Sequence, residues 1–148
     1  MRACMGSAPP RSRAPAYSLP PAEQVAAAAL AVLRAHHTTP SLWKLWTLTL
    51  AQLRQERQTI ALKPERLRRL LVADPRFEVE VHYREEPTKR ALSRCPVCRA
   101  SLAISKNETI FGGTVTVGHR CTRCSYWTGV RRRVPTRYRV RLAGRSAA

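Results

Sequence analysis

Apolar and polar residues repeat with two different periods along the first half of the chain. Apolar residues recur at helical spacing over about 22–36, over a second segment that begins after Ser41, and over a third that begins at Pro64. Ser41 suits the position before a helix, where its side chain can accept a backbone N–H, and Pro64 suits the first helical position. The pattern predicts three amphipathic helices, the last of which ends at Asp74.

Residues 77–84 instead alternate strictly between apolar and polar side chains. A period of two predicts a half-buried β-strand. Residues 85–89 are expected to turn, and residues 90–94 to return as the second strand of a hairpin. Three helices and a hairpin are the element order of a winged helix–turn–helix domain, which we predict for residues 22–94. The alternative is a small α+β domain without a recognition helix.

The composition changes where two C-x-x-C motifs flank residues 99–120. The motifs are Cys95-Pro96-Val97-Cys98 and Cys121-Thr122-Arg123-Cys124. Each motif places two thiolates on a tight turn, and a hairpin between the motifs would bring four sulfurs around one Zn²⁺ at about 2.3 Å. Candidate strands at 102–104, 114–117 and 126–130 complete a three-stranded zinc ribbon over residues 95–134.

The four cysteines are expected to hold zinc for a structural purpose. Four cysteine ligands leave no open position for water or substrate, and a unit of this size takes its folding energy from the metal. The alternative is a redox dithiol, which has no need of a second pair. His119 could replace one ligand, although a position beside the site or in solvent is favoured. Cys4 has no partner nearby and is expected to be a free thiol.

The net charge of the chain indicates what kind of molecule the protein binds. The chain has 27 Lys and Arg residues against 9 Asp and Glu residues, a formal net charge of +18. Such a surplus repels itself in a compact state and favours an anionic partner, most commonly nucleic acid. Anionic lipid or an acidic protein is the alternative.

Two groups of basic residues are predicted to contact nucleic acid. The first lies on the third helix, which would enter the major groove, and on the predicted wing: Lys63, Arg66, Arg69, Lys89 and Arg90. The second follows the last ribbon strand: Arg131, Arg132, Arg133 and Arg137. Guanidinium groups suit phosphate geometry, while the alternative for both groups is a solvated face.

Three aromatic residues of the second half are candidates for stacking on unpaired bases: Tyr126, Trp127 and Tyr138. The alternative is that Tyr126 and Trp127 belong to the ribbon core, and for Trp127 we favour the core. Trp46 is expected in the core of the helical half and Trp43 at its surface.

Residues 1–21 read as a disordered basic leader, and residues 135–148 as a basic C-terminal tail. Apolar residues at 134, 138, 140 and 142 allow part of this tail to pack as a strand. No apolar run approaches the length needed to cross a bilayer, so we predict a soluble protein without a membrane partner. A cytoplasmic location is expected, with association to the nucleoid in a prokaryote.

The winged helix followed by a four-cysteine ribbon resembles archaeal transcription factor E and the alpha subunit of its eukaryotic counterpart. The resemblance is one of architecture over residues 23–130, and only the two cysteine pairs match residue by residue, as zinc ligands. It implies a transcription-associated role and contact with a polymerase. That family has a longer helical linker and less positive charge, so a stand-alone DNA-binding regulator is a second implication.

The sequence as a whole predicts a DNA-binding, transcription-associated α+β protein with a structural zinc ion. The alternative is an RNA-binding structural protein such as a ribosomal component. An enzyme is not expected, because the acids form no clustered pair suited to Mg²⁺. No nucleophile–base motif or glycine-rich phosphate loop is present either.

Overall fold

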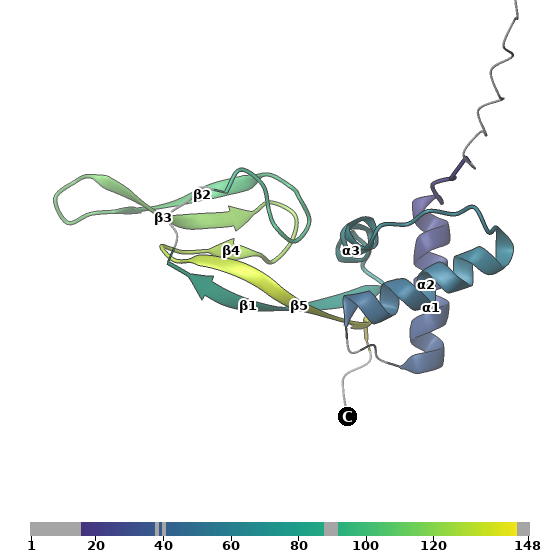
Figure 1. The fold of residues 1–148 in the computed structure, drawn as a ribbon. Helices are drawn as coiled ribbons and strands as arrows, with labels where there is room; N and C mark the ends of the chain where they lie inside the picture. The colour runs from purple at the N-terminus through teal and green to yellow at the C-terminus, as the bar shows by residue number, and fades with distance from the viewer. Residues whose placement is uncertain (1–15, 38, 40, 88–91, 145–148) are drawn as a thin grey trace, which may run out of the picture.

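The computed structural model describes residues 16–37, 39, 41–87 and 92–144. Within these ranges it contains three helices and two small antiparallel sheets, so the chain is an α+β protein. The elements are α1 (Ala22–His36), α2 (Leu42–Glu56), α3 (Pro64–Ala73), β1 (Phe77–Glu86), β2 (Leu102–Glu108), β3 (Thr114–Cys121), β4 (Trp127–Thr128) and β5 (Arg132–Leu142) (Figure 1). No helix in the described ranges is long and apolar enough to cross a membrane.

The three helices form where the sequence predicts them. Ser41 accepts a hydrogen bond from the backbone N–H of Lys44 at 3.2 Å, and α3 starts at Pro64. The helices enclose an apolar core to which β1 and β5 also contribute: Val25, Ala29, Val32, Leu33, Leu45, Leu53, Ile60, Leu62, Leu67, Leu71, Phe77 and Val140. Removing these side chains from water is the main force that holds the helical half together.

The strand predicted from the alternating pattern is confirmed as β1, but its predicted partner is corrected. All ten residues of β1 pair with β5, from Phe77 opposite Leu142 to Glu86 opposite Arg132. Residues 92–94 do not join this sheet, and Arg94 bridges Ser101 instead. The reason is that a long strand with its own alternating apolar residues covers all ten residues of β1, and β5 is such a strand.

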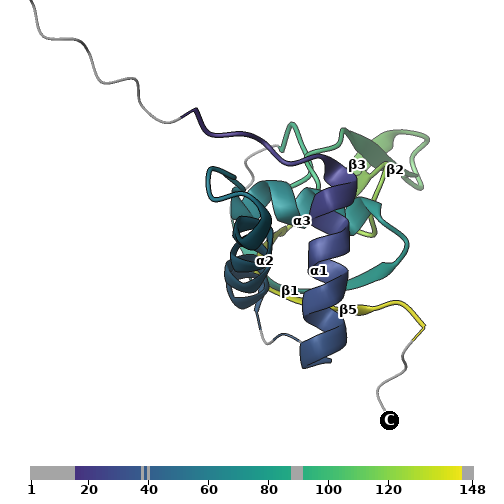
Figure 2. The same cartoon turned by 90° about the vertical axis from the view of Figure 1, so that its right-hand side faces the viewer.

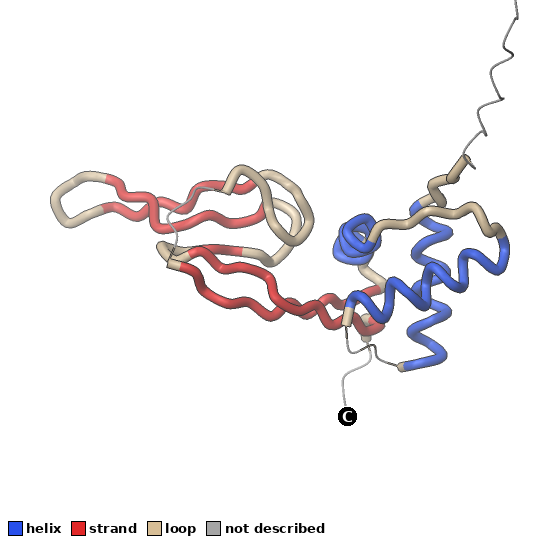
Figure 3. Tube along the Cα trace, viewed as in Figure 1, coloured by secondary structure: helices blue, strands red, loops and turns tan. Residues whose placement is uncertain are grey.

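The cysteine unit, residues 95–130, is inserted between β1 and β5. The three strands predicted in this segment are present as β2, β3 and β4, and they form an antiparallel sheet in the order β2-β3-β4. In Figure 3 the two long strands run from the helices to this second sheet. Buried Gly118 allows β3 and β4 to approach, because a Cβ on it would lie 2.1 Å from the carbonyl oxygen of Thr128. Residues 135–142, placed in the predicted tail, belong to β5.

The end of β5 also contacts the connection between α1 and α2. Thr39 forms an antiparallel bridge with Val140, and both residues are buried. In Figure 2 this end of β5 lies beside α1, next to β1. β5 therefore packs on the helical core and pairs with two earlier segments, β1 and the α1–α2 connection.

The N-terminal segment before α1 is anchored from Ser18 onward. The N–H of Ser18 donates to Thr59 O at 3.1 Å, and Ser18 O accepts from the N–H of Ala61 at 3.1 Å. These bonds form one parallel bridge between Ser18 and Ile60 and no longer strand. Residues 1–15 of the predicted leader, including Cys4, lie outside the described residues.

Candidate metal centre

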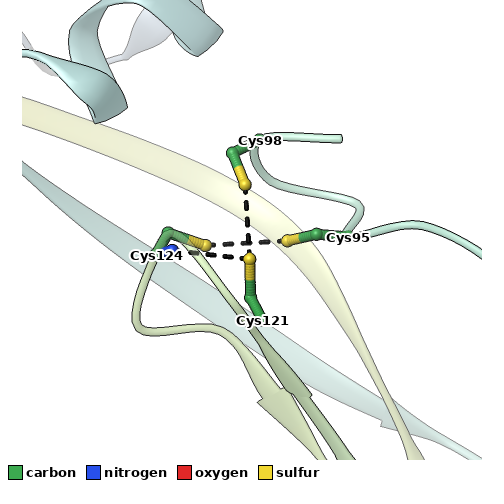
Figure 4. Close-up of side chains that lie close together, drawn as sticks. All are labelled: Cys95, Cys98, Cys121 and Cys124. Atoms are coloured by element: carbon green, nitrogen blue, oxygen red, sulfur yellow. Dashed lines mark hydrogen bonds between the residues drawn. The ribbon is translucent and has the colours of Figure 1, made fainter. Parts of the chain in front are cut away.

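The sulfur atoms of Cys95, Cys98, Cys121 and Cys124 converge on one point. All four lie within 4.8 Å of one another, and Figure 4 shows the side chains directed toward a common centre. The cysteines are free thiols, with two of them buried and two half-buried. His119, two residues before Cys121, is not part of this group.

The spacing of the sulfurs fits a tetrahedral metal ion. The sulfurs of Cys95 and Cys124 are 3.6 Å apart, and those of Cys98 and Cys121 are 3.4 Å apart. Metal–sulfur bonds of about 2.3 Å in a tetrahedron give sulfur–sulfur edges of about 3.8 Å. A metal ion therefore fits among these four atoms with only small adjustments.

Backbone hydrogen bonds hold each cysteine pair in its turn. In the first pair, the N–H of Arg99 donates to Cys95 O, and the N–H of Val97 donates to the sulfur of Cys95 at 3.4 Å. In the second pair, the N–H groups of Arg123 and Cys124 donate to the sulfur of Cys121 at 3.3 and 3.4 Å. Such N–H···S bonds stabilise thiolates.

The pKa values of these thiols depend on burial and on the backbone N–H groups near each sulfur. Burial raises the pKa of Cys98 to about 11 and also raises that of Cys124. Burial acts in the same direction on Cys121, but the two N–H···S bonds, together with contacts to neighbouring thiols, bring its pKa down to about 7. Four neighbouring thiolates need a positive ion, which a bound divalent metal would supply.

The cysteine unit is packed against the rest of the molecule. Cys95, Val97, Cys121 and Tyr126 form a second buried cluster, which continues into Val72, Val81, Tyr83 and Tyr138 of the helical half and the β1–β5 sheet. Arg68 of α3 donates through Nε to Val97 O at 2.9 Å, and Glu65 pairs with Arg99. The metal centre is thus docked directly on α3.

The described basic residues that were predicted to contact nucleic acid lie on or beside two elements, α3 and β5. Lys63 is exposed just before α3, and Arg66 and Arg69 lie on the part of α3 that faces the cysteine pairs. Arg131 is exposed before β5, and Arg137 is exposed within β5 opposite His82. The predictions for Lys89 and Arg90 fall outside the described residues.

Arg132 and Arg133 are both partly buried within the protein. Arg132 is half-buried near Cys95, and its Nε has no hydrogen-bond partner among the described residues. The guanidinium carbon of Arg133 lies 4.2 Å from the ring centroids of both Tyr83 and Trp127. The side chain of Arg133 is therefore occupied within the protein.

The structure shows which of the aromatic side chains are buried and which are exposed. Tyr126 is fully buried and donates its hydroxyl to Arg133 O at 2.7 Å, so it is not available for base stacking. Trp127, which we expected in the core, is 50% exposed. Trp43 is 64% exposed as predicted, and Trp46 is half-buried and donates to Leu62 O at 2.7 Å.

Comparisons with known proteins add no relative. No protein-family model, curated protein or solved structure matches the chain. The site must therefore be interpreted from its own geometry and charge.

Proposed function

We propose that the protein binds nucleic acid, as a DNA-binding factor associated with transcription, and that its four cysteines hold a structural zinc ion. A polymerase or another transcription protein is a further proposed partner, and no catalytic role is proposed. The observation that carries nucleic-acid binding is the surplus of cations that the protein's own acids leave unpaired.

Five of the nine acids of the chain form ion pairs with five arginines. The ion pairs among the described residues join Glu23 and Asp74 to Arg76, Glu65 to Arg68 and Arg99, Glu78 to Arg141, and Glu86 to Arg84. The other described arginines have no such partner. The net charge of +18 already counts every Asp and Glu against a cation, so this surplus has no carboxylate to balance it, which favours a polyanion.

The arrangement of elements supports duplex DNA as that polyanion. Three helices lead into β1, β1 pairs with β5, and the α1–α2 connection bridges the end of β5. This order suits a winged helix whose wing is the β1–β5 pair, with the cysteine unit inserted at its tip. In that arrangement α3 is the helix that would enter the major groove, with the wing near the backbone.

Zinc is the proposed ion because all four ligands are cysteine sulfurs. Soft thiolates in a tetrahedron select zinc over the hard cations that oxygen ligands bind. Metal analysis of reduced protein purified without chelators is expected to give one zinc per chain. The Cys98→Ser variant should hold less metal than the Ser93→Ala variant, whose exposed side chain lies outside the sulfur group. Metal-free protein in which the fold is intact would contradict the assignment.

Competition binding tests the choice of nucleic acid. We expect a labelled 20-base-pair duplex to bind, with log affinity falling linearly as log salt rises because phosphate counterions are released. Unlabelled duplex DNA should compete better than structured RNA. Preference for the RNA would favour the ribosomal alternative, and absence of binding to either at low salt would contradict nucleic-acid binding altogether.

A further inference from the structure

A pocket of about 600 Å³ lies between α3 and the two cysteine pairs. Three arginines line it: Arg66 and Arg69 come from α3, and Arg123 comes from the turn between Cys121 and Cys124. The remaining lining consists of Cys98 and apolar side chains of α3, and it includes no acid. Three cations thus surround one space whose lining holds no carboxylate.

The three arginines are free to bind a ligand from outside the protein. None of the ion pairs among the described residues involves Arg66, Arg69 or Arg123, whereas nearby Arg68 and Arg99 both pair with Glu65. Arg66 is positioned by a bond from its Nη2 to Pro20 O at 2.8 Å. Its Nη1 is buried without a hydrogen-bond partner in the described structure. A buried donor of this kind is costly unless a ligand or water satisfies it.

The relative position of the three arginines is set by the packing around the metal centre. Val72 of α3 contacts the cysteine cluster, and Arg68 bonds Val97 O at 2.9 Å. On the other side of the pocket, the N–H of Arg123 donates to the sulfur of Cys121 at 3.3 Å. Arg123 therefore faces α3 only while the second cysteine pair keeps its turn.

We propose that this pocket receives a phosphate group of a nucleic-acid backbone, held by Arg66, Arg69 and Arg123. The inference rests on the proposed function and identifies where the protein engages one phosphate. Guanidinium groups offer paired N–H donors that match phosphate oxygens, and the apolar lining of α3 strengthens each charged hydrogen bond. A zinc ion held by four thiolates would carry a net charge of about −2 spread over four sulfurs, which is smaller than the charge of the three arginines.

The test compares two double variants that remove equal charge. Arg69→Gln with Arg123→Gln removes two pocket cations whose side chains form no hydrogen bond or ion pair with the described residues, and leaves Arg66 with its bond to Pro20. Arg34→Gln with Arg57→Gln removes two exposed cations elsewhere on the surface, on α1 and after α2. Thermal unfolding and zinc content of both proteins should match the wild type, which confirms that the variants fold.

Binding of the labelled duplex, and of a structured RNA as a second arm, is measured by fluorescence anisotropy over a range of salt concentrations. We expect the pocket variant to bind at least about tenfold more weakly, with a salt slope smaller by about 1, and the control to stay within about threefold. Equal losses in both variants would overturn the pocket while leaving nucleic-acid binding intact.

Free phosphate distinguishes failure of the pocket from failure of the proposed function. Titration of the wild type with inorganic phosphate should shift the NMR signals of the Nε–H groups of Arg66, Arg69 and Arg123, and chloride at equal ionic strength should not. If nucleic acid fails to bind but these signals shift, the proposed function is wrong and the anion site stands. If the signals do not move and the two variants bind alike, the pocket is not a phosphate site.

Discussion

Arg133 is held between two aromatic rings, on Tyr83 of β1 and Trp127 of β4, at 4.2 Å from each ring centroid. Its backbone oxygen also accepts the hydroxyl of buried Tyr126. This one residue therefore links the β1–β5 sheet to the cysteine unit. Its contribution should be to stability rather than to binding.

Replacing Arg133 with Ala is expected to lower the free energy of unfolding by about 1–2 kcal/mol, since two cation–π contacts are lost. Chemical denaturation of the metal-loaded protein measures this. Arg131→Ala is the matched control, because Arg131 is exposed and should change stability by less than about 0.5 kcal/mol. Equal effects would mean that the aromatic contacts contribute nothing.

Gly118 is a second residue whose replacement should be informative. Gly118→Ala would place a methyl group 2.1 Å from Thr128 O, so β3 and β4 must separate at a cost of about 1–3 kcal/mol. In Gly113→Ala the new methyl group would lie 3.4 Å from Thr109 Oγ1, so this variant serves as a milder control. Thermal unfolding of the two zinc-loaded variants measures the difference in stability. A lower melting temperature for Gly113→Ala than for Gly118→Ala would contradict the argument.

Local elements could be predicted from the sequence, and distant pairing could not. The cap at Ser41, the start at Pro64 and the alternation of β1 are encoded within a few residues, so they appear where expected. The partner of β1 is β5, about fifty residues later in the chain. The alternation of apolar and polar residues within one strand does not show which distant strand pairs with it. Strands that are neighbours in the sequence pair most often, so the sequence favoured the segment after residue 89 as the partner of β1.

The residues of the candidate sites could also be predicted only where local spacing defines them. Spacing alone located the four cysteines, because a metal dictates how its ligands must be placed. Arg123 was missed as a candidate contact, although it stands within the second C-x-x-C motif. Its significance arises only when the fold brings it beside Arg66 and Arg69.

At the scale of elements, β5 is expected to stabilise the helices. Val140 is fully buried in the helical core, so Val140→Ala should cost about 2 kcal/mol through lost burial and the cavity left behind. Amide hydrogen exchange should then accelerate in α1 and α2. The neighbouring Arg139→Ala variant is the control, because that side chain is exposed. Unchanged exchange in the helices would contradict a shared core.

At the scale of the whole molecule, two buried clusters are joined through β1, β5 and α3. Removing the metal with a strong chelator is expected to expose the amides of β2, β3 and β4 to exchange while α1 and α2 stay protected. On the proposed zinc assignment, the cysteine unit takes its folding energy from the metal, while the helices have their own apolar core.

Hydrogen exchange followed by mass spectrometry checks this outcome, and zinc added back should restore protection. Simultaneous loss of protection in α1 and α2 at the same chelator concentration would show that the two clusters unfold as a single cooperative unit.

The position of β5 has a consequence for the order of events during synthesis. Ribosomes release a chain from its first residue onward, and a core can close only when its last contributor has emerged. Val140 comes after Cys124, so all four thiols are already outside when the helical core is completed. The four cysteines of the nascent protein can therefore meet the proposed zinc ion before the helices have finished packing.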